Sequence, residues 1–164
     1  MMKITGLFAL VFMLFSCSMI SMYLPSEGNL DSSLKGMVFI NEVSATHPDD
    51  DDWVEIYNAS DSSVDLWGFG FSDKPLDPLQ WSLPLHSIIA GKSYLVIEFN
   101  GKADSPSFGL KDADPLILST PDGKTTIDSL GSILDTNTAS FGRSSDGADT
   151  WTSFTTPTKG GPNS

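Results

Sequence analysis

Residues 52–58 read Asp-Trp-Val-Glu-Ile-Tyr-Asn, and they have the pattern of a β-strand. In an extended strand successive side chains point to opposite faces, so Val54 and Ile56 share one face and the two aromatic residues share the other with Glu55. Both faces are largely apolar, which predicts a central strand that is covered on both sides. Glu55 then needs a cation or hydrogen-bond donors, because an unpaired buried charge is very costly.

The sequence on either side of this strand has the same character. From Met37 onward, short apolar runs alternate with clusters of Gly, Pro, Asp and Asn, which is typical of an all-β sandwich or barrel. No segment keeps the apolar period of a helix over a sufficient length. The predicted strands are 38–43, 53–58, 64–71, 79–83, 94–99, 116–119, 124–130, 139–143 and 150–154.

Two Asp-Gly pairs predict hairpins in the second half of the chain. Asp122-Gly123 joins the sixth and seventh predicted strands, and Asp146-Gly147 joins the last two. Asp-Gly supplies the positive φ angles that tight hairpin turns require. The strands around these turns are therefore expected to pair antiparallel.

The charge balance excludes one class of partner. The chain has 164 residues, with 9 Lys and Arg against 21 Asp and Glu, and a formal net charge of −12. Binding to a phosphate backbone requires clustered cations that displace counterions, and the only arginine is Arg143. We therefore expect no nucleic acid partner. Hydrophobic residues make up 40% of the chain and charged residues only 18%, the composition of a globular domain.

The N-terminus reads as an export signal. Lys3 is followed by a continuous apolar run from Leu7 to Phe15, and then by Cys17, the only cysteine. A cationic start, a short apolar run and a small residue at the cut are typical of a secretory signal peptide. The sequence therefore predicts an exported protein.

Residues 14–17, Leu-Phe-Ser-Cys, resemble the lipobox of bacterial lipoproteins. The resemblance implies cleavage before Cys17, lipid on its thiol, and a membrane as the partner of that lipid. We expect a signal peptide over 1–16, the lipidated cysteine and a flexible tether over 17–36, and a folded domain over 37–164.

Two alternatives for this end stay open. A retained membrane anchor is the minority interpretation, because a spanning helix needs about 20 apolar residues and serines interrupt this run early. A free or buried thiol at Cys17 is the other. Ser18 is not the acidic residue that holds some lipoproteins at the inner membrane, so the outer membrane or the cell surface is the preferred location.

Several short motifs follow one another across the predicted domain. They include Asn41-Glu42-Val43, the strand 53–58, Val64-Asp65-Leu66, Trp81, Ser140-Phe141-Gly142-Arg143, Asp146-Gly147, Trp151 and Thr156-Pro157. In this order and spacing they resemble the bacterial form of the lamin-tail domain family over nearly all of residues 37–164. The resemblance implies an all-β, immunoglobulin-like antiparallel β-sandwich. It also implies structural roles for Asn41, Glu42, Trp53, Glu55, Tyr57, Asn58, Gly68, Asp73, Trp81, Gly142, Arg143, Asp146, Gly147 and Trp151.

Arg143 is expected to pair with a buried carboxylate. A planar guanidinium suits bidentate contact with a carboxylate, and Glu55 and Glu42 on the first two predicted strands are the candidates. A solvent-facing position at a sheet edge is the alternative.

Four consecutive acids, Asp49, Asp50, Asp51 and Asp52, form the densest charge run in the chain. Oxygen ligands crowded in a loop can hold calcium. The spacing and central glycine of an EF-hand loop are absent, so a solvated acidic loop is the better interpretation. Calcium is the only cofactor that the sequence brings into consideration.

Trp67 is the one tryptophan outside the motif positions, and it directly precedes Gly68. An exposed ring there would offer a stacking surface for a sugar. Together with the acidic run, it supports a lectin-like alternative in which calcium assists carbohydrate binding.

No catalytic motif is found in the chain. There are two histidines, no cysteine besides Cys17, and neither a GxSxG elbow nor an HExxH pair. We expect a non-catalytic, envelope-anchored interaction or structural module that binds an unidentified protein or surface partner. The alternatives are the lectin-like domain that binds a glycan and an accessory domain for an exported hydrolase.

Overall fold

The computed structural model of the chain describes residues 32–45, 51–133 and 138–164. The predicted signal peptide over 1–16, Cys17 and the tether up to residue 31 lie outside these residues, as do Asp49 and Asp50 of the acidic run. Within the described part of the chain, no helix is long and apolar enough to cross a membrane.

The described residues form strands joined by turns, with one short 3-10 helix, η1 (Ser32–Leu34), and no α-helix. The strands are β1 (Val38–Ser44), β2 (Trp53–Asn58), β3 (Val64–Asp65), β4 (Gly70–Ser72), β5 (Trp81–Ser82), β6 (Ile88–Ile89), β7 (Ser93–Glu98), β8 (Leu116–Ser119), β9 (Thr126–Leu130), β10 (Ser140–Arg143) and β11 (Trp151–Phe154).

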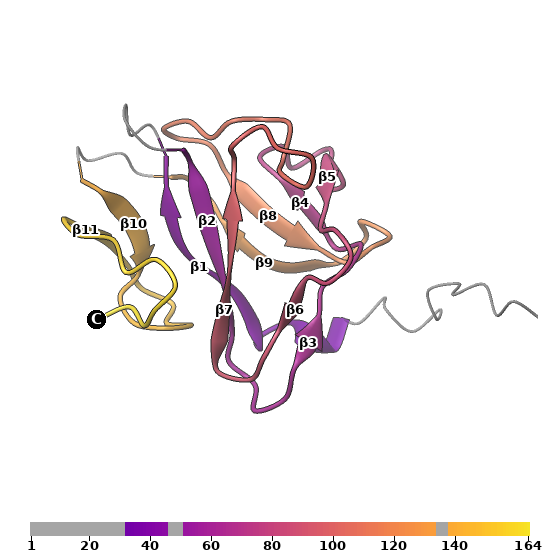
Figure 1. Ribbon diagram of the computed structural model, residues 1–164, viewed down its shortest axis with the longest axis horizontal. Helices are drawn as coiled ribbons and strands as arrows, with labels where there is room; N and C mark the ends of the chain where they lie inside the picture. Colours follow the sequence, from indigo (N-terminus) through magenta and orange to yellow (C-terminus); the bar gives the residue numbers. More distant parts are fainter. Residues whose placement is uncertain (1–31, 46–50, 134–137) are drawn as a thin grey trace, which may run out of the picture.

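These strands build two packed layers, which Figure 1 shows one behind the other. The first layer is a five-stranded sheet in the order β11-β10-β1-β2-β7, and the second is a four-stranded sheet in the order β5-β4-β8-β9. Strands β3 and β6 form a separate pair beside them. Neighbouring strands in all three sheets pair antiparallel. The predicted immunoglobulin-like antiparallel β-sandwich is confirmed.

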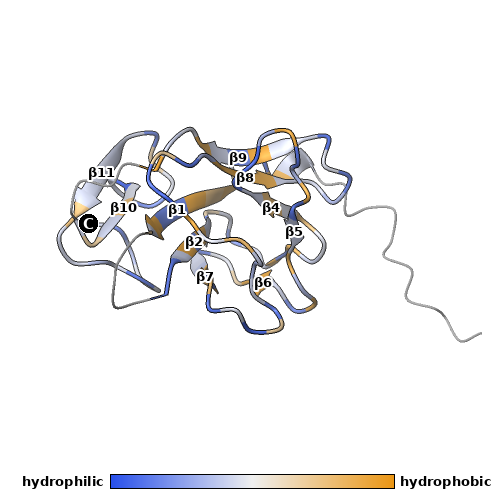
Figure 2. Ribbon diagram, turned by 90° about the horizontal axis from the view of Figure 1, so that it is seen from above, coloured by the Kyte–Doolittle hydropathy of each residue, from blue (hydrophilic) through white to orange (hydrophobic). Residues whose placement is uncertain are grey.

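The core lies between the two layers, where strands of both sheets turn apolar side chains inward. Figure 2, viewed along the gap, shows the hydrophobic colour on β1, β2, β4 and β8. The core side chains without measurable exposure include Val38, Ile40, Val54, Ile56, Phe69, Phe71, Leu116 and Leu118. Burying a side chain of this size stabilises the fold by about 1.5–3 kcal/mol, so the sandwich interior is the main source of stability.

Strand β2 is the central strand that its sequence predicts. It lies between β1 and β7, and all six of its residues are buried. The β1–β2 pairing shifts register between Ile40 and Glu42, which places Glu42 opposite Glu55 and Val43 opposite Val54. A bulge inserts one extra residue into a strand. Because Asn41 is that residue, the alternation of side chains between the two faces of β1 shifts by one position after it. As a result, Ile40 and Val43 both face the core although they are three residues apart.

The predicted strand 64–71 is wrong as a single element, because the chain turns within it. The Asp65 side chain accepts a hydrogen bond from Trp67 N at 2.9 Å, and Gly68 adopts a φ of 79°. Glycine reaches this left-handed conformation without steric cost. The segment therefore splits into β3, which pairs with β6, and β4, which joins the four-stranded sheet.

The domain also begins earlier than the predicted boundary at residue 37. Ser32–Leu34 form η1, and Leu34 is only 8% exposed within the core cluster. Met37 N donates to Leu34 O at 2.9 Å, which connects this turn to the start of β1. Residues 32–36 thus belong to the folded domain, and the tether prediction is wrong for them.

Candidate functional site

Arg143 is buried at the end of β10, with a relative exposure of 4%. Its Nε donates to Ile40 O at 2.8 Å, and Nη1 donates to Ala148 O. Its Nη2 reaches both oxygens of Asp128 on β9, at 2.9 Å and 3.1 Å. Asp128 in turn accepts from Ile40 N at 2.7 Å. The guanidinium therefore ties the five-stranded sheet to the opposite layer.

The expected pairing of Arg143 with Glu55 or Glu42 is wrong, and the register explains why. Glu42 lies opposite Gly142 in the β1–β10 pairing. Residues directly opposite one another share a face and neighbouring residues alternate, so the Arg143 side chain leaves β10 on the other side. There it lies between the rings of Phe39 and Trp151, at 5.0 Å and 4.9 Å from their centres.

Glu42 and Glu55 face each other on the outer side of the five-stranded sheet, and neither has measurable exposure. Glu42 Oε1 accepts from Ser140 Oγ at 2.5 Å and from Thr158 N at 3.0 Å. Glu42 Oε2 accepts from Thr158 Oγ1 at 2.7 Å. Hydrogen-bond donors, rather than a cation, therefore offset the cost of burying the Glu42 carboxylate.

Glu55 is held in the same way. Its Oε1 accepts from Asn41 Nδ2 at 3.0 Å, and its Oε2 accepts from Gly160 N at 2.6 Å. Burial raises the pKa of Glu55 to about 7, against the lowering effect of these two hydrogen bonds, and Glu42 and Asp146 raise it further. The predicted need for donors beside Glu55 is met, although the donors come from a distant part of the chain.

Asp146 completes this group at the β10–β11 turn. Its Oδ1 accepts from Asn41 Nδ2 and from Asn163 N, each at 3.0 Å, and its Oδ2 accepts from Tyr94 OH at 2.5 Å. Burial, followed by the nearby Asp146 carboxylate, raises the pKa of Tyr94 above its usual range. Gly147 N donates to Asn41 Oδ1 at 3.2 Å, so the turn is fixed to β1.

We call residues 157–163 the C-terminal strap, because these contacts hold the segment across the outer face of the five-stranded sheet. Asn163 is 4% exposed, and its Nδ2 donates to Asn41 O at 3.1 Å and to Arg143 O at 2.7 Å. We call the side chains beneath and within the strap the polar cluster: Asn41, Glu42, Glu55, Tyr94, Asp146, Thr158 and Asn163. Its carboxylates accept hydrogen bonds from backbone and side-chain donors, so the cluster fastens the strap to the sheet.

The sequence points to Asn41, Glu42, Glu55 and Asp146 as structural, and the structure brings these four together. It does not point to Thr158 or Asn163 individually. Their only signal is the closing Thr-Pro and Gly-Pro-Asn pattern, which has no apolar periodicity.

The other motif residues have separate structural surroundings. Asn58 donates to Ser62 O at 2.8 Å and to Ile89 O at 3.1 Å, which holds the β2–β3 turn against β6. Gly142 lies so close to β1 that a Cβ would come 2.9 Å from Asn41 O. Asp73 Oδ1 is buried without a hydrogen-bond partner among the described residues.

The tryptophans and Tyr57 differ in their surroundings. Trp53 is buried, and Lys159 Nζ lies 5.4 Å from its ring centre. Tyr57 stacks on Tyr94 at 5.1 Å between ring centres, and Trp151 stacks on Phe141 at 5.4 Å.

Trp67, the predicted sugar-stacking residue, is half-buried in the turn between β3 and β4. Its backbone N donates to Asp65 within that turn.

The acidic run is described only in part. Asp52 Oδ2 accepts from Leu110 N at 2.9 Å, so this carboxylate stabilises a loop. Among the described residues, no group of three or more His, Cys, Asp or Glu is placed to hold a metal ion. Asp49 and Asp50 lie outside those residues, and the calcium site stays a prediction.

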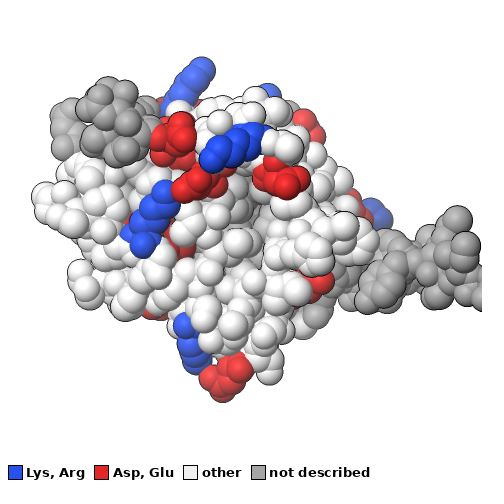
Figure 3. Space-filling model, in the orientation of Figure 1, with Lys and Arg blue, Asp and Glu red and all other residues white. Residues whose placement is uncertain are grey.

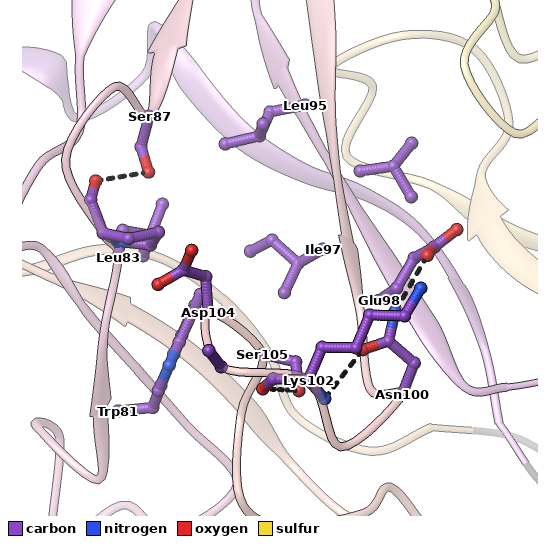
Figure 4. A pocket seen from close by; sticks show the side chains of 13 residues that line it. Trp81, Leu83, Ser87, Leu95, Ile97, Glu98, Asn100, Lys102, Asp104 and Ser105 are labelled. Atoms are coloured by element: carbon purple, nitrogen blue, oxygen red, sulfur yellow. Dashed lines mark hydrogen bonds between the residues drawn. The ribbon is translucent and has the colours of Figure 1, made fainter.

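A hollow of about 430 Å³ opens between β7 and the segment around β5. In Figure 4, Leu95 and Ile97 on β7 face Trp81 and Leu83 across the opening, and the Asp104 carboxylate lies between the two walls. Asn100, Lys102 and Ser105 lie along the rim. Ligand pockets in proteins span about 300–1,000 Å³, and this hollow has that size, with apolar walls and several polar side chains.

The two-layered antiparallel fold defines an immunoglobulin-like β-sandwich module. The sequence model of the lamin tail domain family matches residues 31–133, well over half of the chain. The chain therefore belongs to the lamin tail domain family, as its motifs predict. Strands β10 and β11 and the C-terminal strap lie beyond the matched residues. Neither the curated proteins nor the solved structures gave a match.

Proposed function

We propose that this protein is an interaction module of the cell envelope, held to a membrane by lipid on Cys17 and binding a partner through its β-sandwich. One observation carries the proposal: the buried carboxylates Glu42 and Glu55 and the half-buried Asp146 are occupied in fastening the strap. The hollow beside β7 has apolar walls that include Trp81, Leu83 and Ile97, which suits the binding of a ligand.

The membrane anchor is proposed from the sequence alone. The Leu-Phe-Ser-Cys stretch ends at Cys17, and the folded domain begins at Ser32. The residues between them contain Ser, Pro, Gly and Asn and carry no apolar period, a composition that suits a tether. Two or more acyl chains anchor a protein far better than one, so lipid on Cys17 and on its amine would hold the domain firmly at the outer membrane or the cell surface.

Replacement of the cysteine tests the anchor. We expect Cys17→Ala to move the protein from the membrane fraction to the soluble fraction and to abolish incorporation of a labelled fatty acid. Ser21→Ala, four residues further along, is the matched control and should change neither readout. Membrane retention of Cys17→Ala without label would show that a retained helix, not lipid, holds the chain.

Photo-crosslinking in cells tests the interaction itself. A photoreactive amino acid replaces Asp104 at the rim of the hollow in one variant and Asp61, which is 94% exposed in the β2–β3 turn, in another. We expect a crosslinked product of discrete mass from position 104 and none from position 61. If neither these positions nor a wider set over the surface gives a product, the protein is not an interaction module.

A further inference from the structure

The edge of β7 beside the hollow turns some of its main-chain groups away from β2. Phe99 N donates to Asp52 O at 2.8 Å, so these two residues form a hydrogen-bonded pair of the β2–β7 ladder. Such pairs alternate with non-bonded pairs in an antiparallel ladder, and Val54 lies opposite Ile97 while Glu55 lies opposite Val96. Ile97 therefore turns its main chain toward β2, whereas Val96 and Glu98 turn theirs outward.

From Leu95 to Ile97, this edge lacks the features that usually protect a sheet edge. Natural proteins place lysine, proline or a bulge on exposed edge strands to prevent pairing with another chain. Strand β7 reads Ser-Tyr-Leu-Val-Ile-Glu and pairs with β2 without a register shift. Because β6 precedes β7 through a short turn, it lies beside the Ser93 end, and the half from Leu95 to Glu98 borders the hollow instead.

The surface around the hollow suits an apolar side chain between two polar margins. Trp81 and Leu83 form the wall opposite β7. Leu85 and Ile88, in the segment that follows this wall, are 61% and 55% exposed. Figure 3 shows basic and acidic side chains gathered over the upper part of this face, with a mostly uncharged surface below them. The rim residues Lys102 and Asp104 offer one charge of each sign.

We propose that β7 binds an extended peptide segment of a partner protein, which adds as a further strand and places an apolar side chain in the hollow. This inference rests on the proposed function and names the chemistry of its partner. Main-chain hydrogen bonds along an edge strand supply affinity in strand addition, and a pocket for alternate side chains supplies specificity. The peptide would pair with the main chain of Val96 and Glu98, and its apolar side chain would lie between Trp81 and Ile97.

Selection from a phage library of random eight-residue peptides, with the full-length chain in detergent as the target, provides the probe. Peptides that bind are measured by calorimetry against the unmodified chain and against Val96→Pro. Proline is tolerated on an edge strand when its nitrogen faces outward, so this variant removes the outward N–H and keeps the β2–β7 ladder. We expect binding to weaken at least about tenfold, because a main-chain hydrogen bond is lost and the ring obstructs the strand.

Matched control variants show whether peptide binding depends on the main chain of the β7 edge or on other parts of the surface. Val96→Thr keeps the N–H, and Leu76→Ala changes a fully exposed leucine outside the hollow, so both should bind within about twofold of the unmodified chain. Ala103→Trp fills the hollow and should weaken binding, whereas Ala103→Ser should not. Amide hydrogen exchange of the unmodified chain should slow at Val96 and Glu98 when the peptide is bound. If Val96→Pro does not fold, this measurement alone tests whether the peptide pairs with the β7 edge.

Each other outcome overturns the inference. These outcomes are a library that yields no peptide, peptides that bind Val96→Pro equally well, and unchanged exchange at both amides. Binding to a glycan array in place of peptides would make the hollow a carbohydrate site. If sedimentation shows a dimer of the unmodified chain that the Val96→Pro variant does not form, the occupant of the β7 edge is a second copy of this chain. If the crosslinked product from position 104 persists in the Val96→Pro chain, the interaction module stands and only the peptide inference fails.

Discussion

The two ends of the five-stranded sheet differ in how their polar groups are used. At the β10–β11 end, Arg143, Asp146 and the C-terminal strap bring charged and amide groups together, and nearly every one accepts or donates within the domain. At the β7 end, the strand borders a hollow with apolar walls and outward main-chain groups. The comparison shows that the polar interactions lie on the outer face of the sheet beneath the strap, whereas the main-chain groups of Val96 and Glu98 point outward at the β7 edge.

The largest effect is expected at the polar end, on removal of the only arginine. Arg143→Ala leaves the Asp128 carboxylate and two carbonyl groups without their donor. Breaking one side of a buried ion pair costs about 3–5 kcal/mol, and urea unfolding measures the loss. Lys92→Ala, in an exposed pair with Asp61, should cost no more than about 1 kcal/mol. Equal stability of Arg143→Ala and the unmodified chain would contradict the assignment of this end as the stabilising one.

The next largest expected effect is a pH dependence of the free energy of unfolding, and it comes from Glu55. In the unfolded chain Glu55 loses its proton near the ordinary pKa of 4.5, whereas burial in the folded chain raises the pKa to about 7. Between these values the unfolded state binds fewer protons, so the free energy of unfolding falls as the pH rises through the window. The fall amounts to at most about 3–4 kcal/mol, because one pKa unit corresponds to about 1.4 kcal/mol.

The Glu55→Gln variant isolates this contribution. It does not titrate, so its urea midpoints should vary less than those of the unmodified chain between about pH 4.5 and pH 7. Glu98→Gln is the control at the other end of the sheet, where an exposed carboxylate has a pKa lowered by the hydrogen bond and charge of Lys159. A slope that survives in Glu55→Gln would place the titrating group elsewhere.

The smallest effect is expected at the β7 edge. Val96→Pro should change the unfolding free energy by about 1 kcal/mol or less, because its N–H takes no part in the ladder to β2. Ile97→Pro, one residue away, removes an inward N–H and should cost about 3 kcal/mol or more. Thermal melts of the two variants check which main-chain amides of β7 face away from β2. Equal losses of stability would mean that the Val96 amide does not face outward.

Local sequence was enough to predict the layers of the sandwich. Strands 53–58 and 116–119 coincide with β2 and β8, since each contains an uninterrupted apolar pattern between clear turn signals. Strand 64–71 was predicted as one element because its apolar residues continue through the turn at Gly68, where Asp65 accepts a hydrogen bond from Trp67 N. β6 has only two residues, Ile88 and Ile89, too few for a period to appear.

The polar cluster was predictable only in part. Its residues Asn41, Glu42 and Glu55 lie in strands whose motifs mark them as structural, but the bulge at Asn41 decides which of them share a face. The partner of Arg143 was missed for a related reason. A shift of one residue reverses the face of every side chain in a strand, and Gly142 rather than Arg143 lies opposite Glu42.

The place of β1 within the sheet has a mechanical consequence. A lipid anchor on the N-terminal side would pull on the domain through η1 and then β1, which is flanked by β2 and β10. Tension along β1 would load the ladders on both of its sides in shear, so many hydrogen bonds would resist together instead of opening one after another. A partner held at β7 would share this load through β2, and the domain would transmit force between a membrane and its ligand without unzipping from an edge.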